Sequence, residues 1–69
     1  MNELGIAKFK ANVQVGDIIR VGTTEIGYND EKLSYHGEVI AIREKDFILR
    51  ELVVEFTISY KSVYWHCAE

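Results

Sequence analysis

The sequence predicts an all-β fold: a small, five-stranded, partly open barrel with a short N-terminal extension. Short runs of β-branched and aromatic residues recur along the 69-residue chain, turn-forming or charged residues separate them, and charges interrupt the stripe that a helix would need. A barrel is favoured because five short strands in a flat sheet would leave long unpaired edges. We assign residues 1–12 to the extension and residues 13–69 to the barrel domain.

The first half of the chain contains one strong strand signal and one ambiguous stretch. A Gly-Asp turn followed by a β-branched run predicts a strand over residues 17–21. A short helical turn is expected around residues 4–10, although Gly5 weakens it. Residues 22–34 hold two glycines, two threonines and an Asn-Asp pair, which predict a long loop or an irregular hairpin. Long loops in compact domains often bind partners, so function is sought there first.

Four further strands follow, joined by short turns. They are predicted over residues 35–43, 47–51, 53–59 and 63–67. A charged Glu-Lys-Asp turn joins the first two of these, and a polar Tyr-Lys-Ser step separates the last two. In the last strand, alternation places Val63, Trp65 and Cys67 on one apolar face. Tyr64 and His66 point the other way.

The aromatic residues indicate where the core lies. Phe47, Phe56 and Trp65 share strand faces with isoleucine and valine, so we expect all three in the core. Cys67 is expected there as well, because a free cysteine usually behaves as a small apolar residue.

Several of these segments together resemble a known superfamily. A hydrophobic-Gly-Asp-hydrophobic opening occupies residues 15–21, a Gly-Glu-Val-Ile strand occupies residues 37–40, and the polar step lies at residues 60–62. With the long loop and the tight hairpins, this layout resembles the Src-homology-3-like small-barrel superfamily over residues 13–67. Members of that superfamily bind peptides, nucleic acids or other proteins. The resemblance therefore implies a non-enzymatic binding module.

A narrower resemblance covers the middle and the end of the chain. Residues 37–42 and 46–51 are similar to a shortened first motif of the Sm-like RNA-binding proteins. Residues 58–63 are similar to the end segment of the Hfq type, with its Tyr-Lys pair. Arg43 stands where that family prefers an acidic residue, and the match needs a one-residue deletion. This resemblance implies a nucleic-acid-binding small barrel as the alternative function.

The charge balance favours a protein partner over nucleic acid. Asp and Glu total 11 against 8 Lys and Arg, for a formal net charge of −3, whereas phosphate contacts usually make nucleic-acid modules basic. Both signs are interspersed along the chain, as on a solvated mixed surface. A small acidic domain of this kind also resembles the accessory proteins of bacteria and their phages, some of which bind and modulate a host protein.

Cysteine content and hydropathy predict a cytoplasmic location. The chain has one cysteine and forms no internal disulfide, whereas a secreted domain of this size normally has several. The N-terminus lacks the basic and apolar regions of a signal peptide, and no apolar run approaches the length of a membrane span. We therefore expect a cytoplasmic protein with no membrane partner.

Catalytic and metal sites are not expected. His36, His66 and Cys67 are the residues that zinc would prefer, and a structural zinc site normally needs four such ligands. His66 and Cys67 are neighbours and would point to opposite faces of their strand. A small barrel also offers little pocket for a nucleophile, its base and an oxyanion hole. We predict no enzyme activity, no metal and no cofactor.

Four residues are the candidates for contact with a protein partner: Tyr28, Tyr35, His36 and Tyr64. Tyr28 and Tyr35 flank the long loop, and tyrosine is a common anchor in protein interfaces. The alternative interpretation is structural, because small barrels also use tyrosine to cover their rims. An exposed last strand over residues 63–67 would in addition allow self-association by edge pairing.

Overall fold

The chain begins with a helix, α1 (Glu3–Asn12), in this computed structural model, which describes residues 1–68. The side chain of Asn2 caps the helix by accepting a hydrogen bond from the N–H of Gly5 at 2.8 Å. The helix is longer than the turn expected from the sequence, because Gly5 lies in the capped first turn, where its low helix propensity matters least. No helix within residues 1–68 is long and apolar enough to cross a membrane.

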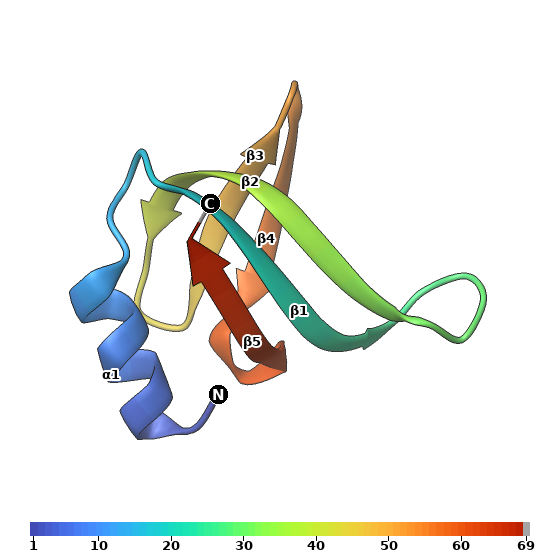
Figure 1. Ribbon diagram of the computed structural model, residues 1–69, viewed down its shortest axis with the longest axis horizontal. Helices are drawn as coiled ribbons and strands as arrows, with labels where there is room; N and C mark the ends of the chain where they lie inside the picture. The colour runs from blue at the N-terminus through green and yellow to red at the C-terminus, as the bar shows by residue number, and fades with distance from the viewer. Residues whose placement is uncertain (69) are drawn as a thin grey trace.

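Five antiparallel strands follow and form one sheet (Figure 1). They are β1 (Ile18–Ile26), β2 (Lys32–Ile42), β3 (Asp46–Glu51), β4 (Val54–Ser59) and β5 (Val63–Ala68). A turn of 3-10 helix, η1 (Tyr60–Ser62), joins β4 to β5. The order across the sheet is β4-β3-β2-β1-β5, so β4 and β5 are its edges. The prediction of a mainly β domain with five strands is confirmed.

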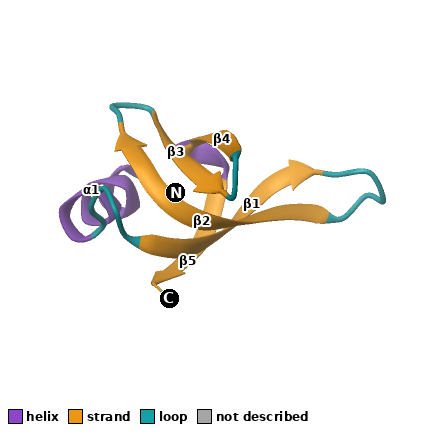
Figure 2. Cartoon of the chain, turned by 90° about the horizontal axis from the view of Figure 1, so that it is seen from above, coloured by secondary structure: helices purple, strands orange, loops and turns teal. Residues whose placement is uncertain are grey.

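Residues 22–34, predicted as a long loop or an irregular hairpin, form an irregular hairpin, with a register shift between Gly22 and Ile26. β1 continues to Ile26, which pairs with Lys32 at the start of β2, and only residues 27–31 form the turn. The ends of the two strands project from the sheet as an arm (Figure 2). Most of the arm residues beyond Thr23 are exposed, so this hairpin lacks the alternating apolar pattern that identifies a half-buried strand.

The long strand β2 curves so that it can pair with two neighbours. Its first part, up to Glu38, pairs with β1, and its second part pairs with β3. Gly37 lies where the partners change, and a Cβ at this position would overlap the backbone carbonyl of Arg50 on β3. The close approach of β2 to β3 therefore requires glycine.

The core lies between the inner face of the sheet and α1. It consists of Phe9, Val13, Ile19, Val21, Val39, Phe47, Leu49, Ile58, Tyr60 and Val63. The ring of Phe9, the buried residue of α1, lies 4.7 Å from that of Phe47 and 5.6 Å from that of Tyr60. The core position expected for Phe47 is thus confirmed. Phe56 is half-buried and packs against this core.

The core positions expected for Trp65 and Cys67 were wrong. Trp65 is 39% exposed and Cys67 is exposed, although Val63 is buried. An irregularity in the pairing of β1 with β5 explains the difference, because Val63 pairs with Thr23 whereas Trp65 pairs with the adjacent Gly22. Two steps along β5 therefore match one step along β1, and the alternation of faces reverses between Val63 and Trp65.

Candidate functional site

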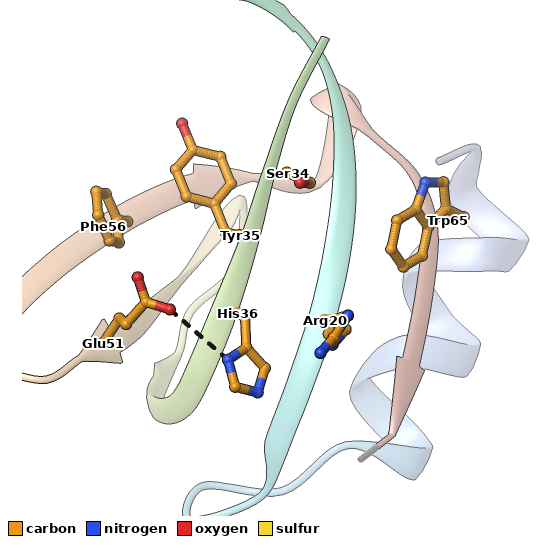
Figure 3. Close-up of a pocket in the computed structure, with 7 residues that line it drawn as sticks. All are labelled: Arg20, Ser34, Tyr35, His36, Glu51, Phe56 and Trp65. Carbon is orange, nitrogen blue, oxygen red and sulfur yellow. Dashed lines mark ion pairs between the residues drawn. The ribbon is translucent and has the colours of Figure 1, made fainter.

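A hollow of about 370 Å³ opens at the surface of the sheet, and Tyr35 and Phe56 of its lining also pack against the core (Figure 3). We call it the outer cleft. Its lining takes residues from all five strands: Arg20, Ser34, Tyr35, His36, Glu51, Phe56 and Trp65. Aromatic and charged side chains that converge on one concave surface are typical of a binding site.

The strand register brings the residues of the outer cleft together. Arg20 on β1 lies opposite His36 on β2, and Gly22 lies opposite Ser34. Across the other side of β1, Gly22 pairs with Trp65 on β5. Directly paired residues in antiparallel strands point to the same face of the sheet. Two short rows of residues therefore cross the strands at the outer cleft (Figure 3). One row is Arg20 and His36, and the other is Trp65, Gly22 and Ser34.

Trp65 forms one wall of the outer cleft. A Cβ at Gly22 would overlap the indole nitrogen, so the ring lies directly on the backbone of β1. The ring of Tyr64 meets that of Trp65 edge to face at 6.4 Å, and the ammonium group of Lys32 lies 4.9 Å from the Tyr64 ring. An aromatic surface thus continues from the cleft toward the arm.

Tyr35 and Phe56 form a second aromatic wall. Their ring centroids are 5.0 Å apart at an interplanar angle of 49°. The hydroxyl of Tyr35 donates a hydrogen bond of 3.3 Å to the carboxylate of Glu25 on β1. Partial burial, and then the negative charge and hydrogen bond of Glu25, raise the pKa of Tyr35 above its ordinary value. Tyr35 therefore presents a neutral phenol to the cleft at physiological pH.

His36 and Glu51 form an acid–base pair in the lining of the cleft, with Glu51 on the side of Phe56 (Figure 3). The Nδ1 atom of His36 lies 3.6 Å from a carboxylate oxygen of Glu51, and both side chains are half-exposed (Figure 3). The pair is an ion pair only when His36 is protonated, and solvent screens it. Both residues also line a second, more open hollow of about 420 Å³, to which Ile18 and Leu52 add exposed apolar surface.

The four binding residues proposed from the sequence occupy different places. Tyr35 and His36 line the outer cleft. Tyr64 lies beside it and contacts Trp65. Tyr28 is fully exposed in the turn at the end of the arm, outside the lining of the cleft.

Five lining residues were not among the candidates from the sequence: Arg20, Ser34, Glu51, Phe56 and Trp65. Trp65 and Phe56 were assigned to the core, and Ser34 to the long loop or irregular hairpin. The signal that could have identified Trp65 is Gly22, an unusual residue within the β-branched start of β1. A glycine inside a strand often marks a close approach of another group, here the indole ring.

The outer cleft combines polar groups with aromatic side chains. Arg20, Ser34 and Glu51 supply its hydrogen-bonding groups. Among residues 1–68, no group of three His, Cys, Asp or Glu side chains is arranged to hold a metal ion. Comparisons of the chain with protein-family models, with curated proteins and with solved structures give no match.

Proposed function

We propose that this chain is a non-enzymatic protein-binding module that takes an extended segment of another protein into the outer cleft. The observation that carries the proposal is the exposed indole of Trp65, which lies on the β1 backbone across the cleft from Tyr35 and Phe56. Tryptophan, tyrosine and arginine are the residue types that contribute most to binding at protein interfaces. We also propose that the fold is of the Src-homology-3-like type, since η1 occupies the polar step on which that resemblance rests.

The distribution of charge supports a protein partner rather than nucleic acid. Within the outer cleft, the positive charge of Arg20 is balanced by the negative charge of Glu51. Arg50 pairs with Glu38 at 3.3 Å, and Arg43 pairs with Asp46. A phosphate backbone would therefore meet carboxylates beside the arginines, whereas a peptide with mixed polar groups would not be repelled.

The same proposal places the protein in a reducing cytoplasm, as an adaptor or modulator of another protein. Its single cysteine, Cys67, is exposed. In an oxidising compartment such a thiol would form disulfides with other chains.

The proposal is tested with peptides selected from a random display library against the folded protein. Trp65 is the only tryptophan, so a peptide that enters the cleft changes the tryptophan emission as it binds. Binding is measured in parallel by the anisotropy of a labelled peptide. We expect Trp65→Ala to weaken binding by about 30-fold or more, corresponding to the loss of about 2 kcal/mol at an interface anchor.

Tyr28→Ala is the matched control, because it removes an equally aromatic side chain outside the cleft. It should leave the affinity unchanged. Peptides that bind wild type and Trp65→Ala equally well would show that the outer cleft is not the site. Salt-dependent binding of a single-stranded RNA oligomer, with no peptide selected, would favour the nucleic-acid alternative instead.

A further inference from the structure

The hairpin between β3 and β4 ends in an exposed apolar tip. Leu52 and Val53 form its turn and are 90% and 93% exposed, and the adjacent Val54 is half-exposed. We call these three residues the tip. Figure 1 shows the hairpin apex directed away from α1. Three consecutive exposed apolar side chains are unfavourable for a soluble domain unless another surface covers them.

The backbone at the tip adds a second observation. Leu52 has φ 56°, in the left-handed region that glycine and asparagine adopt far more readily than leucine. Folding alone would thus favour glycine or asparagine at this position of a two-residue hairpin turn. Instead, leucine occupies this position, although its backbone conformation is strained and its apolar side chain is exposed to solvent.

A hollow at the opposite end of the same hairpin has the complementary character. It has a volume of about 290 Å³ and lies where β3 begins and β4 ends. We call it the socket; it is lined by Ile6, Glu44, Lys45, Ser59, Tyr60 and Lys61. The partly exposed side chain of Ile6 contributes apolar surface, Tyr60 is the buried member of the lining, and the socket is large enough for two aliphatic side chains.

The charges around the tip and the socket are of opposite sign. Glu51 and Glu55 flank the tip in the sequence, and both are exposed. Lys45 and Lys61 line the socket. Lys10 adds a third ammonium group 5.2 Å from the centre of the Tyr60 ring.

One acidic residue, Glu44, also lines the socket. Its backbone carbonyl accepts a hydrogen bond of 2.8 Å from the Lys10 ammonium group. With three lysines against one glutamate, the surroundings of the socket remain positive, so they attract the acidic flanks of the tip.

We propose that the tip of one copy of this chain inserts into the socket of a second copy. A tip cannot fill the socket of its own chain, because the two lie at opposite ends of one β-hairpin. The contact is therefore head to tail, and repeated copies form an open assembly with a free tip and a free socket unless the rotation between copies closes a ring. The tip and the socket share no residue with the lining of the outer cleft, although Glu51, which lines the cleft, lies next to the tip. Self-association goes beyond the function proposed above.

Analytical ultracentrifugation over a range of protein concentrations tests the proposal. We expect the mass of wild type to rise with concentration above the 8.0 kDa of the monomer. Leu52→Asn and Val53→Ser should each remain monomeric over the same range. Asparagine accepts the left-handed backbone, so Leu52→Asn should fold at least as stably as wild type. Leu4→Asn is the matched control, because it removes an exposed leucine from α1 and should leave the association unchanged.

A charge exchange tests the pairing of the tip with the socket. Glu55→Lys puts a positive charge beside the tip, and Lys61→Glu puts a negative charge at the socket. Each variant alone should associate about tenfold more weakly than wild type, because like charges meet at every contact. An equal mixture should associate again, since each tip then finds a socket of opposite charge on the other variant. Thermal unfolding of each variant checks that it is folded.

Three outcomes would overturn the proposal. Wild type could remain monomeric at all concentrations. Association could survive Leu52→Asn and Val53→Ser, which would point to another surface, such as the edge of β5. Association could depend on Leu52 but not on Lys61, which would indicate a symmetric contact between two tips. None of these outcomes bears on peptide binding at the outer cleft, which Trp65 reports separately.

Discussion

At the scale of single residues, Gly22 determines where the only tryptophan of the chain can lie. A methyl group at this position would overlap the indole nitrogen of Trp65. The ring is partly exposed, so it can swing away from β1 rather than distort the strand. The position of the Trp65 ring in the cleft therefore depends on the absence of a side chain at Gly22 on β1.

We predict that Gly22→Ala displaces Trp65 toward solvent and destabilises the domain by about 1–3 kcal/mol, as overpacking does. This cost exceeds the gain of about 0.5–1 kcal/mol from replacing a strand glycine by alanine. The tryptophan emission should shift to longer wavelength, and the urea midpoint should fall. Ser34→Ala is the control, because it removes a side chain paired with Gly22 on the other side and leaves the indole in place. An unchanged emission spectrum for Gly22→Ala would contradict the prediction.

At the scale of secondary-structure elements, α1 is held to the sheet by very few side chains. Phe9 is its buried residue and contacts Phe47 and Tyr60. His66 of β5 meets the same ring edge to face at 5.0 Å. Within α1, only Ile6 packs against the core beside Phe9, so the apolar stripe is short, which explains why the sequence pattern indicated only a short turn.

We predict that Phe9→Ala detaches α1 and destabilises the domain by about 3–5 kcal/mol. A domain of this size has little more stability than that to lose, so the variant should be largely unfolded. Phe9→Leu keeps most of the buried volume and should cost less than about 1.5 kcal/mol. Circular dichroism during thermal unfolding distinguishes the two variants. Equal melting temperatures would show that the anchor is elsewhere.

The elements that the sequence predicted correctly are those with one face in the core. The strands around Val39, Phe47 and Ile58 carry apolar side chains at period two, and this pattern is readable without a structure. The sequence left a loop and an irregular hairpin open for the arm, because most of its residues are exposed. The outward position of Trp65 was missed because it depends on an irregular pairing with β1, which no property of β5 alone reveals.

The residues of the outer cleft were likewise hard to predict from local sequence patterns. Tyr35 and His36 are adjacent in the sequence and next to the predicted loop, so a local argument could select them. Arg20, Glu51 and Trp65 join them only through pairing across strands that are distant in the sequence. A site assembled from five strands needs the register of the whole sheet, which the sequence pattern leaves open.

At the scale of the whole molecule, Tyr60 links elements from opposite ends of the chain. It is buried in η1, and its hydroxyl donates a hydrogen bond of 2.7 Å to the carbonyl of Arg43 in the β2–β3 turn. Its backbone N–H donates to the carbonyl of Lys45 at 3.2 Å. The amino group of Met1 donates to the carbonyls of Tyr60 and Val63 at 3.0 and 2.6 Å. A charge on the phenol would therefore disturb the point where α1, η1 and the hairpin meet.

We predict that this arrangement makes the fold sensitive to alkali. Burial, and then the carboxylate of Asp46, raise the pKa of Tyr60 above its ordinary value of 10.0, and the pKa of Tyr35 is raised as well. The folded state thus keeps its protons at a pH where the unfolded chain has lost them. The resulting stabilisation is complete below about pH 9 and is lost as the pH rises through 10 and the folded-state pKa values.

Urea midpoints measured across the alkaline range should therefore be constant at first and then fall. Tyr60→Phe should show a shallower fall, because one of the two groups that couple folding to pH is gone. At neutral pH the same variant should be less stable by about 1–3 kcal/mol, since the Arg43 carbonyl loses its buried donor. If Tyr60→Phe lost stability with pH as steeply as wild type, the alkaline transition would have to arise from another group, and Tyr60 would serve the fold through packing alone.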